Sequence, residues 1–440
     1  MARKAPAVPK RISAAVLNSL SAGVVPRLGL EYIAIGRKNE ISALLDDLDV
    51  VESGGSVFRL ISGRYGSGKS FLIQLMRSNA MERGFAVCDC DLSPERRLAG
   101  SQGQGLATYR ELIRNLSVKA SPDGNALPGI LTKWISSVQL SEAKKHGYSP
   151  GSPELARATE LAIMEKTSSF QSLVHGFDFS YAVSTFYRGV AEGDETKKQA
   201  ALKWLRAEYT TKTQARHELS VSSIITDDTW YDCIKLVSAL MPVCGYKGLI
   251  VFIDEAVNLY KIVQTVSRES NYEKLLNIFN DCMQGKLSHT AFFMGGTPQF
   301  IHDNRRGLAS YEALRSRLVE NRFATAGMRD YRGPILTLDP LTPEELIALL
   351  KRIVYIHSVH YSWEVPVSDE ELVAFARSLT EKMGAETLLT PREVVRDFTG
   401  LLNLLHQNPD KTFETLASEI DIKGASEEES IDEEYAEFEL

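Results

Sequence analysis

The segment 57–76, VFRLISGRYGSGKSFLIQLM, constrains the fold of this chain more than any other stretch. Its centre, residues 63–70, matches the pattern G-x-x-x-x-G-K-[ST] at every fixed position. The apolar run 57–61 predicts a short buried strand, and the apolar residues after the loop recur at helical spacing, so we expect a helix to begin near Lys69. A strand, a glycine loop and a helix in this order are typical of a phosphate-binding loop. The structural alternative is a glycine-rich turn that binds nothing.

The glycines of this loop allow successive backbone N–H groups to point into one concavity, and the start of the helix adds its positive end. We expect Lys69 to reach the β- and γ-phosphates of a nucleotide and the Ser70 hydroxyl to bind Mg²⁺. ATP and Mg²⁺ are therefore the predicted cofactors. The predicted nucleotide contacts from this loop are Gly63, Gly66, Ser67, Gly68, Lys69, Ser70 and Phe71.

A second strand followed by acids lies at 248–255, GLIVFIDE. Consecutive apolar residues predict a strand buried on both faces, and the two acids at its end complete the Walker B pattern. The pattern is weak by itself but specific beside a phosphate loop. We expect Asp254 to hold the Mg²⁺ shell and Glu255 to orient and polarise the attacking water.

Two further strands end in polar residues. The strand 85–91 ends at Asp89–Asp91, at the carboxyl edge of the predicted sheet, where ligands of open α/β sheets gather. The strand 291–296 is expected between the two Walker strands and is followed by Thr297, which either contacts the γ-phosphate or water or caps a loop. Cys88 and Cys90 alternate along their strand and are expected to face the core.

The predicted organisation is an α/β domain interrupted by helices. Residues 119–225 show loop and amphipathic patterns without a strand pattern, which predicts a large helical insertion. The last core strand is expected at 334–338, and a capping-box sequence at 342–345 starts an all-helical stretch to 408. The expected boundaries are an N-terminal arm and helix (1–30), the ATPase core (31–332), a last strand with a helical lid (333–420) and an acidic disordered tail (421–440).

The charge of the chain is concentrated at one end. The net charge is −7, but 427–440 holds eight acidic residues and no basic one, so the rest of the chain carries +1. In the tail, Ile431, Tyr435 and Phe438 fall on one helical face, so it is either a solvated end or a short helix that docks into a partner. No apolar run reaches membrane-spanning length, the N-terminus lacks a signal-peptide pattern, and the five cysteines have neither disulfide nor zinc spacing. These features predict a cytoplasmic protein.

Taken together, these pieces resemble the AAA+ (ASCE) class of P-loop NTPases, near the branch of origin-recognition and initiator-loader proteins. The matching segments are 35–40, 63–70, Asp254-Glu255, Thr297, Ser316-Arg317 and 390–392. The resemblance implies a parallel sheet core and a C-terminal helical lid. It also implies that Thr297 is sensor 1, Arg392 is sensor 2, Arg37 contacts nucleotide, and Arg317 is an arginine finger, with Arg315 as its competitor. Arg392 in a first helical turn opposes the helix dipole, which independently favours a ligand-facing role.

A narrower resemblance is to the P-loop ATPases of bacteriophage-exclusion (BREX) systems, the BrxC/BrxD family, in its short BrxD-like form. It is carried by 23–26 leading into 35–37, by 63–70, and by 201–205, 245–250 and 295–298. This resemblance implies an ATP-dependent component of prokaryotic defence against phage DNA, with helicase-like or other defence proteins as partners. No winged-helix pattern follows the helical lid, which argues against autonomous sequence-specific DNA binding.

The sequence leaves two main functions open. One is a homo-oligomeric ATPase motor or switch that acts on DNA or a nucleoprotein partner. The other is an ATP-gated scaffold that recruits a helicase or nuclease and hydrolyses ATP slowly. A small-molecule kinase is a third, weaker reading because no acceptor site is evident. The best local basic patches, His302 with Arg305-Arg306 and Lys144-Lys145-His146, fit charged solvated faces as well as DNA contacts.

Overall fold

In a computed structural model, the described residues are 8–319, 321, 329–381 and 390–419, and they form two compact units. One unit comprises 40–62 and 76–337, and the other comprises 1–39, 63–75 and 338–440. The predicted acidic tail lies outside the described residues. We call these units the sheet unit and the helical unit.

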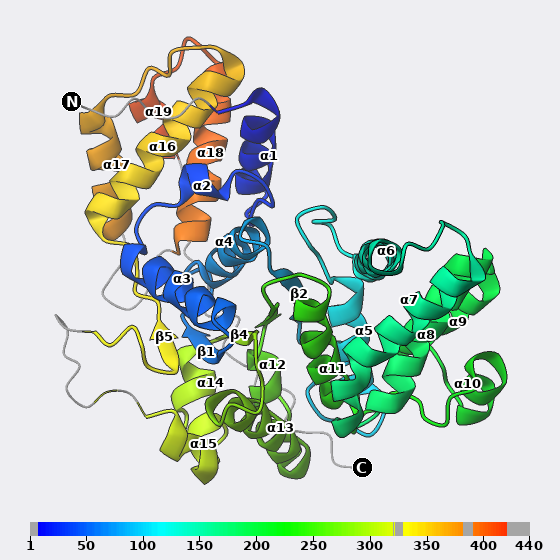
Figure 1. Cartoon of the computed structure of the whole chain (residues 1–440). Coiled ribbons are helices and arrows are strands. Elements are labelled where there is room, and N and C mark those ends of the chain that lie inside the picture. The colour runs from blue at the N-terminus through cyan, green and yellow to red at the C-terminus, as the bar shows by residue number, and fades with distance from the viewer. Residues whose placement is uncertain (1–7, 320, 322–328, 382–389, 420–440) are drawn as a thin grey trace. The chain divides into compact units, whose positions relative to one another are not determined.

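The sheet unit is built on five parallel strands, shown with their flanking helices in Figure 1. The strands are β1 (Ser56–Ser62), β2 (Ala86–Asp91), β3 (Leu249–Asp254), β4 (Thr290–Gly296) and β5 (Ile335–Thr337). Their order across the sheet is β2-β3-β4-β1-β5. β4 therefore lies between β1 and β3, the strands that carry the two Walker motifs. This confirms the expected placement of the strand before Thr297 and gives the AAA+ α/β fold.

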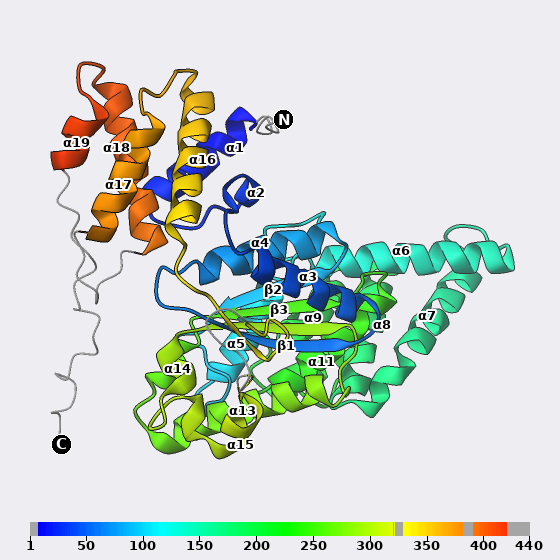
Figure 2. The same cartoon turned by 90° about the vertical axis from the view of Figure 1, so that its left-hand side faces the viewer.

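The strand register assigns one row of side chains to each face of the sheet. Phe58 of β1 shares a row with Phe292 of β4, and its ring meets Phe279 of α13 edge to face at 5.4 Å. The next residue, Arg59, points to the opposite face and pairs with Asp47 of α3 at 2.7 Å. Figure 2 shows α3 (Lys38–Glu52) on one side of the sheet and α11 (Trp230–Val243) and α13 (Thr265–Met283) on the other. Because both faces are covered, the central strands are apolar throughout.

A long helical segment separates β2 from β3. Its helices are α5 (Gln104–Arg114), α6 (Leu127–His146), α7 (Pro153–Thr167), α8 (Gly176–Glu192), α9 (Glu195–Leu205), α10 (Lys212–Leu219) and α11, with the 3-10 turn η1 (Ser168–Ser172). In Figure 1, α6 to α9 gather beside the sheet rather than on it. Their core is continuous with that of the sheet, because Tyr109 of α5 donates to the Leu205 carbonyl (2.8 Å). The described part of 119–225 contains no strand, as the sequence pattern predicts.

The remaining elements of the sheet unit follow β3 and β4. They are α12 (Val257–Tyr260), α14 (Pro298–His302), η2 (Leu308–Ser310) and α15 (Glu312–Arg317). The predicted burial of Cys88 and Cys90 is confirmed, and burial raises the pKa of both thiols, that of Cys90 to about 12. Neither thiol is thereby activated as a nucleophile.

The helical unit buries a separate apolar core. Its elements are α1 (Lys10–Ser21), α2 (Leu30–Ile33), the start of α4 (Lys69–Glu82), α16 (Pro343–Tyr361), α17 (Asp369–Glu381), α18 (Pro391–Gln407) and α19 (Phe413–Glu419). Both predicted capping boxes are present, at Thr342–Glu345 and at Thr390–Glu393. The expectation of a loose arm over residues 1–12 is wrong for its described end. There α1 already begins at Lys10 and Val8 is buried in the core, because the apolar stripe of α1 extends back to it.

His357 is a buried histidine at the centre of this helical core, with no exposed surface. Trp363 donates its indole N–H to Nδ1 of His357 (3.0 Å), so Nε2 carries the ring proton and faces Asn403 Oδ1 (3.2 Å). Burial lowers the pKa of His357 from 6.5 to about 4 against the opposing hydrogen bond from Asn403, and the neighbouring His406 and His360 lower it further. The histidine is therefore folded in its neutral form.

We predict an acid-dependent loss of stability that depends on His357. The unfolded state binds the proton near pH 6.5 and the folded state near pH 4, so this stabilisation is present above pH 6.5 and is lost as the pH falls to 4. Denaturant unfolding at pH 7 and pH 4.5 should show a smaller pH difference for His357→Gln than for the natural protein. His217→Gln, at an exposed position of α10, is the control. An unchanged pH difference in His357→Gln would contradict the assignment.

Candidate nucleotide-binding site

The phosphate loop follows β1 directly and ends where α4 begins, at Lys69 as predicted. Gly66 and Gly68 have φ values of 68° and 94°, in the left-handed region that glycine tolerates. The Lys69 ammonium donates to the carbonyl oxygens of Gly63 (2.7 Å) and Arg64 (2.9 Å). The side chain thus closes the loop on itself and orders its own backbone.

Polar atoms in this loop fit a phosphate group. The Ser67 hydroxyl is buried and has no hydrogen-bond partner among the described residues. The N–H groups of Gly66 and Gly68 also donate to no acceptor in the described part of the chain. A Cβ at Gly68 would meet no atom within 4 Å, so its backbone is open to close approach. Donors without acceptors beside an open glycine match an anionic, oxygen-rich ligand.

Side chains of the helical unit brace the loop from outside. Arg37 donates from Nη2 to the Ser67 carbonyl (2.9 Å), so it contacts the loop backbone. A Cβ on Gly66 would lie 2.4 Å from Thr390, the N-cap of α18. Phe71 packs against the core of the helical unit, so its ring has a structural role. Arg392 is exposed and donates to the Gly23 carbonyl (2.7 Å), which ties α18 to the turn after α1. These contacts leave the nucleotide roles of Arg37, Phe71 and Arg392 as predictions.

In the sheet unit, the Walker B acid Asp254 is fixed by its neighbours on both sides. Its carbonyl accepts the N–H of Leu92, which follows β2 (3.0 Å), and the N–H of Ala256 binds the Gly295 carbonyl of β4 (3.0 Å). The Asp254 carboxylate accepts the N–H of Glu255 (2.9 Å). The end of β3 is therefore held between the ends of β2 and β4, which sets the position of its carboxylate.

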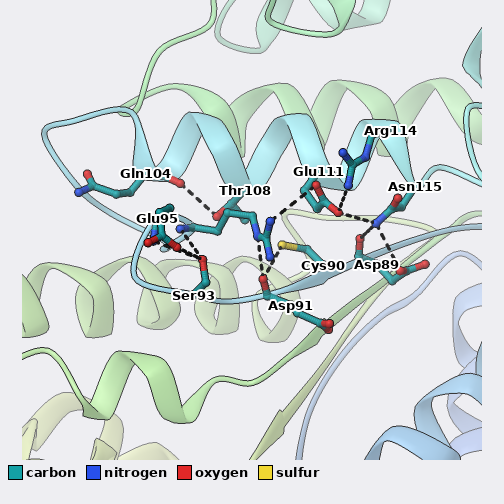
Figure 3. A network of polar contacts seen from close by, with 11 residues as sticks. Asp89, Cys90, Asp91, Ser93, Glu95, Gln104, Thr108, Glu111, Arg114 and Asn115 are labelled. Atoms are coloured by element: carbon teal, nitrogen blue, oxygen red, sulfur yellow. Dashed lines mark hydrogen bonds and ion pairs between the residues drawn. The ribbon is translucent and has the colours of Figure 1, made fainter. Parts of the chain in front are cut away.

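Asp91 of β2 pairs in register with Asp254, so the two side chains share one face at the carboxyl edge of the sheet. Burial raises the pKa of Asp91, and the negative charges of Asp254 and Asp89 raise it further. In Figure 3 the Asp91 carboxylate points away from the polar network at the end of β2. Asp89 is used within that network and beside it, because it accepts from Arg77 (2.7 Å) and its carbonyl accepts from Asn115 (2.9 Å). Of the two predicted edge acids, Asp91 is the one whose carboxylate faces away from these contacts.

Glu255 adopts a left-handed backbone conformation, with φ of 55°. Such a conformation is uncommon for residues other than glycine and costs about 1–2 kcal/mol. It arises at the sharp turn where the chain leaves β3 and is returned to β4 by the hydrogen bond of Ala256. Strain of this kind gathers at functional sites because it fixes the direction of a side chain.

Thr297 performs the capping role that the sequence left open as an alternative. Its hydroxyl accepts the Phe300 N–H (3.2 Å) at the N-cap of α14, and the residue is buried. The cap does not test the sensor role, because a hydroxyl that accepts one hydrogen bond still carries a proton to donate.

The two candidate finger arginines differ in their contacts. Arg317 donates from Nε to Asn280 Oδ1 (3.0 Å) and from Nη1 to the Ala313 carbonyl (2.8 Å). The Arg315 side chain forms no hydrogen bond or ion pair with another described residue. Both lie in the last turn of α15 and are exposed. The Arg317 guanidinium is thus held in one direction, and that of Arg315 is not.

The basic patches noted in the sequence divide in the same way. Arg306 donates to the carbonyls of Tyr260 and Ile262 (both 3.3 Å) and lies over the Tyr260 ring, so its charge is used inside the fold. Lys144, Lys145 and His146 form the last turn of α6, where cations are favourable to the helix dipole. Both patches therefore have structural explanations, apart from the exposed Arg305.

Comparison with known proteins identifies the family. A family model described as BREX system ATP-binding protein BrxC/D matches residues 8–421. The chain belongs to this BrxC/D family. It is therefore an ATP-binding protein of the AAA+ fold from a BREX system, and the phosphate loop described above is the nucleotide-binding element of this family member.

Other comparisons add little to the BrxC/D assignment. A search of curated proteins found no significant match. Among solved structures, the chain is similar to Cdc6p from Pyrobaculum aerophilum, at 9% identity and a TM-score of 0.38, over 85% of this chain and 63% of that chain. The chain thus spans less than two thirds of that protein's length, and a similarity this low carries no weight for function. None of the helices in the described ranges offers an apolar stretch of membrane-spanning length.

Sequence patterns did not reveal two features of this BrxC/D site. The left-handed turn at Glu255 depends on the contact between the chain after β3 and the end of β4, for which the sequence has no pattern. The pairing of Asp91 with Asp254 depends on strand order, although the polar end of 85–91 was a usable indication.

We predict that Glu255 stores backbone strain that a glycine would release. Glu255→Gly should be more stable to denaturant than Glu255→Ala by about 1 kcal/mol, because glycine adopts the left-handed conformation freely. At Glu165, an exposed position within α7, the order should reverse, since glycine weakens a helix relative to alanine. The same order at both positions would show that Glu255 is not strained.

Proposed function

We propose that this protein hydrolyses ATP as a homo-oligomer, and that the ATPase cycle drives a motor or switch acting on DNA or a DNA-bound protein during defence against phage. The observation that carries the proposal is the joint presence of a phosphate loop after β1 and an acid pair after β3, on strands that flank β4. Membership of the BrxC/D family supports nucleotide binding. The polar donors of the loop support phosphate as the bound group.

Each residue of the proposed site has a defined task. Lys69 and the loop N–H groups bind the phosphates, and Ser70 with Asp254 would hold Mg²⁺, a hard cation suited to hydroxyl and carboxylate oxygens. When bound, Mg²⁺ neutralises charge that develops on the phosphate oxygens. Glu255 orients and polarises the attacking water, and its strained backbone fixes where its carboxylate points. Thr297 and Arg392 would sense the γ-phosphate.

We predict opposite defects for the two Walker motifs. Lys69→Ala should weaken binding of a fluorescent ATP analogue and abolish turnover, because a point charge on the phosphates is lost. Glu255→Gln should bind the analogue normally but hydrolyse ATP at least tenfold more slowly, because removing a general base costs about 10²–10⁴ in rate. Phosphate release and equilibrium binding measure the two quantities separately.

The natural protein provides the decision between the two functions. Turnover that rises several-fold with DNA supports a motor or switch. Turnover that is slow and indifferent to DNA would instead favour an ATP-gated scaffold for a helicase or nuclease. If Lys69→Ala binds and hydrolyses ATP normally, the site assignment itself is wrong.

A second prediction concerns the arginine finger. Arginine fingers contribute about 10³–10⁵ in rate in well-studied phosphoryl-transfer systems. We expect Arg317, whose guanidinium is held by Asn280, to act on ATP bound by a neighbouring subunit. A mixture of Arg317→Ala and Lys69→Ala should regain activity that neither variant has alone, because mixed interfaces pair an intact loop with an intact finger.

The matched control for the finger is Arg315, the other exposed arginine of α15. Mixing Arg315→Ala with Lys69→Ala should give no gain beyond the activity of Arg315→Ala by itself. Recovery with Arg315→Ala but not with Arg317→Ala would transfer the role to Arg315. Full activity of both single variants would exclude a finger on α15.

A further inference from the structure

A cavity of about 340 Å³ lies in the sheet unit, on loops that leave the carboxyl ends of β2 and β3. None of the residues assigned to the nucleotide site lines it. The lining residues are Pro94, Arg97, Asn258, Lys261, Ile262, Val263 and Gln264. One wall is thus the segment between β2 and α5, and the other is the segment from α12 to the start of α13.

The α12–α13 wall is anchored from behind by buried charge. Arg268 of α13 is 6% exposed and donates to the carbonyls of Ile262 (2.9 Å) and Val263 (3.3 Å). Burying an arginine is costly unless its hydrogen bonds are satisfied, so these contacts fix the loop firmly. With the backbone carbonyls turned inward, the Val263 side chain points outward and is 82% exposed.

The other wall is fixed by helices α5 and α13. The Arg97 N–H donates to the Gln104 carbonyl (3.3 Å), and the Arg97 carbonyl accepts from the Thr108 hydroxyl (2.7 Å). Buried Asn271 of α13 accepts the N–H groups of Leu98 and Ala99, both at 2.9 Å. Gln104 and Thr108 appear in Figure 3, on the helix above the end of β2. The loop is therefore rigid before any ligand arrives.

The cavity presents two cations that the fold does not use. Nε of Arg97 is buried without a hydrogen-bond partner, and neither Arg97 nor Lys261 forms an ion pair with a described residue. Gln264 adds an exposed amide. Glu95, the acid in the same loop, already accepts from the Ser93 hydroxyl (2.9 Å). An arginine with an unsatisfied buried nitrogen, a lysine and an amide form a donor set for an anion.

We propose that this cavity binds phosphate groups of a nucleic-acid backbone. Arg97 supplies a planar fork for phosphate oxygens, Lys261 supplies a point charge, and Val263 offers an apolar surface for a sugar or base. Outside its acidic tail the chain carries a net charge of only +1, so attraction to nucleic acid depends on local cations of this kind. An acidic peptide would bring apolar side chains as well, and the cavity offers them little surface because Ile262 is buried.

The cavity is also linked to the proposed catalytic acid through one short segment. Glu255 and Lys261 lie at the two ends of residues 255–261, which include the single turn of α12. Asn258 in that turn donates to the Leu92 carbonyl (2.8 Å), beside the end of β2. A phosphate held by Lys261 therefore acts on the same rigid segment that positions Glu255. This link rests on the proposed ATPase function, whereas phosphate binding does not.

The test measures oligonucleotide binding by the full chain without nucleotide. Fluorescence anisotropy with a labelled 20-nucleotide single strand and its duplex is followed between 50 and 200 mM salt. Arg97→Gln/Lys261→Gln should bind roughly tenfold or more weakly. The slope of log affinity against log salt should also shrink by about 1–2, since each phosphate contact contributes about 0.7–0.9. Lys133→Gln/Arg157→Gln, at exposed sites of α6 and α7, removes the same charge elsewhere and should change neither quantity.

Further variants separate the remaining explanations. Lys261→Gln alone, at an exposed position, should show part of the effect even if Arg97→Gln unfolds the loop. Lys69→Ala should retain oligonucleotide binding, so loss of ATPase activity with retained binding refutes the proposed function and not this site. An unchanged salt slope in the double variant overturns the proposal. So does a pocket that binds a labelled peptide of residues 427–440 but no oligonucleotide.

Discussion

The insertion of β4 between β1 and β3 is the constraint on which the rest of the molecule depends. The parallel register aligns the carboxyl ends of these strands, so the phosphate loop, the Walker B acids and Thr297 all leave the same edge of the sheet. One backbone hydrogen bond, from Ala256 to Gly295, then sets the direction in which the chain leaves β3. The strained conformation of Glu255 and the position of α12 both follow from it.

Buried polar residues in this protein serve mainly to fix loops. Arg268, Asn271 and Arg306 use their hydrogen bonds on backbone atoms of segments that leave the sheet. Satisfying a buried charge with carbonyl oxygens makes the loop conformation hard to change, because displacing the loop would leave the charge unpaired. The surfaces carried by these loops, including the cavity at Arg97 and Lys261, are consequently preorganised.

Several side chains that sequence patterns favour as ligand contacts are occupied by structural work. Lys69 closes its own loop, Thr297 caps α14, Arg392 binds Gly23, and Arg306 supports α12. Such contacts do not exclude a ligand role, since a nucleotide that offers stronger charge-assisted hydrogen bonds can replace carbonyl acceptors. They do mean that binding exchanges contacts, and that the affinity depends on the difference between the two sets.

The sequence by itself determined the elements, the phosphate loop and the Walker B acids, because those features depend on local spacing. The strand at 57–61, the helix start at Lys69, the capping boxes at Thr342 and Thr390 and the burial of Cys88 and Cys90 were all predictable in this way. Only the tertiary structure decided which side chains meet. The pairing of Asp91 with Asp254, the turn at Glu255 and the joining of Arg97 to Lys261 bring together residues from separate segments. Strand order and loop packing set those contacts, and neither leaves a periodic pattern in the chain.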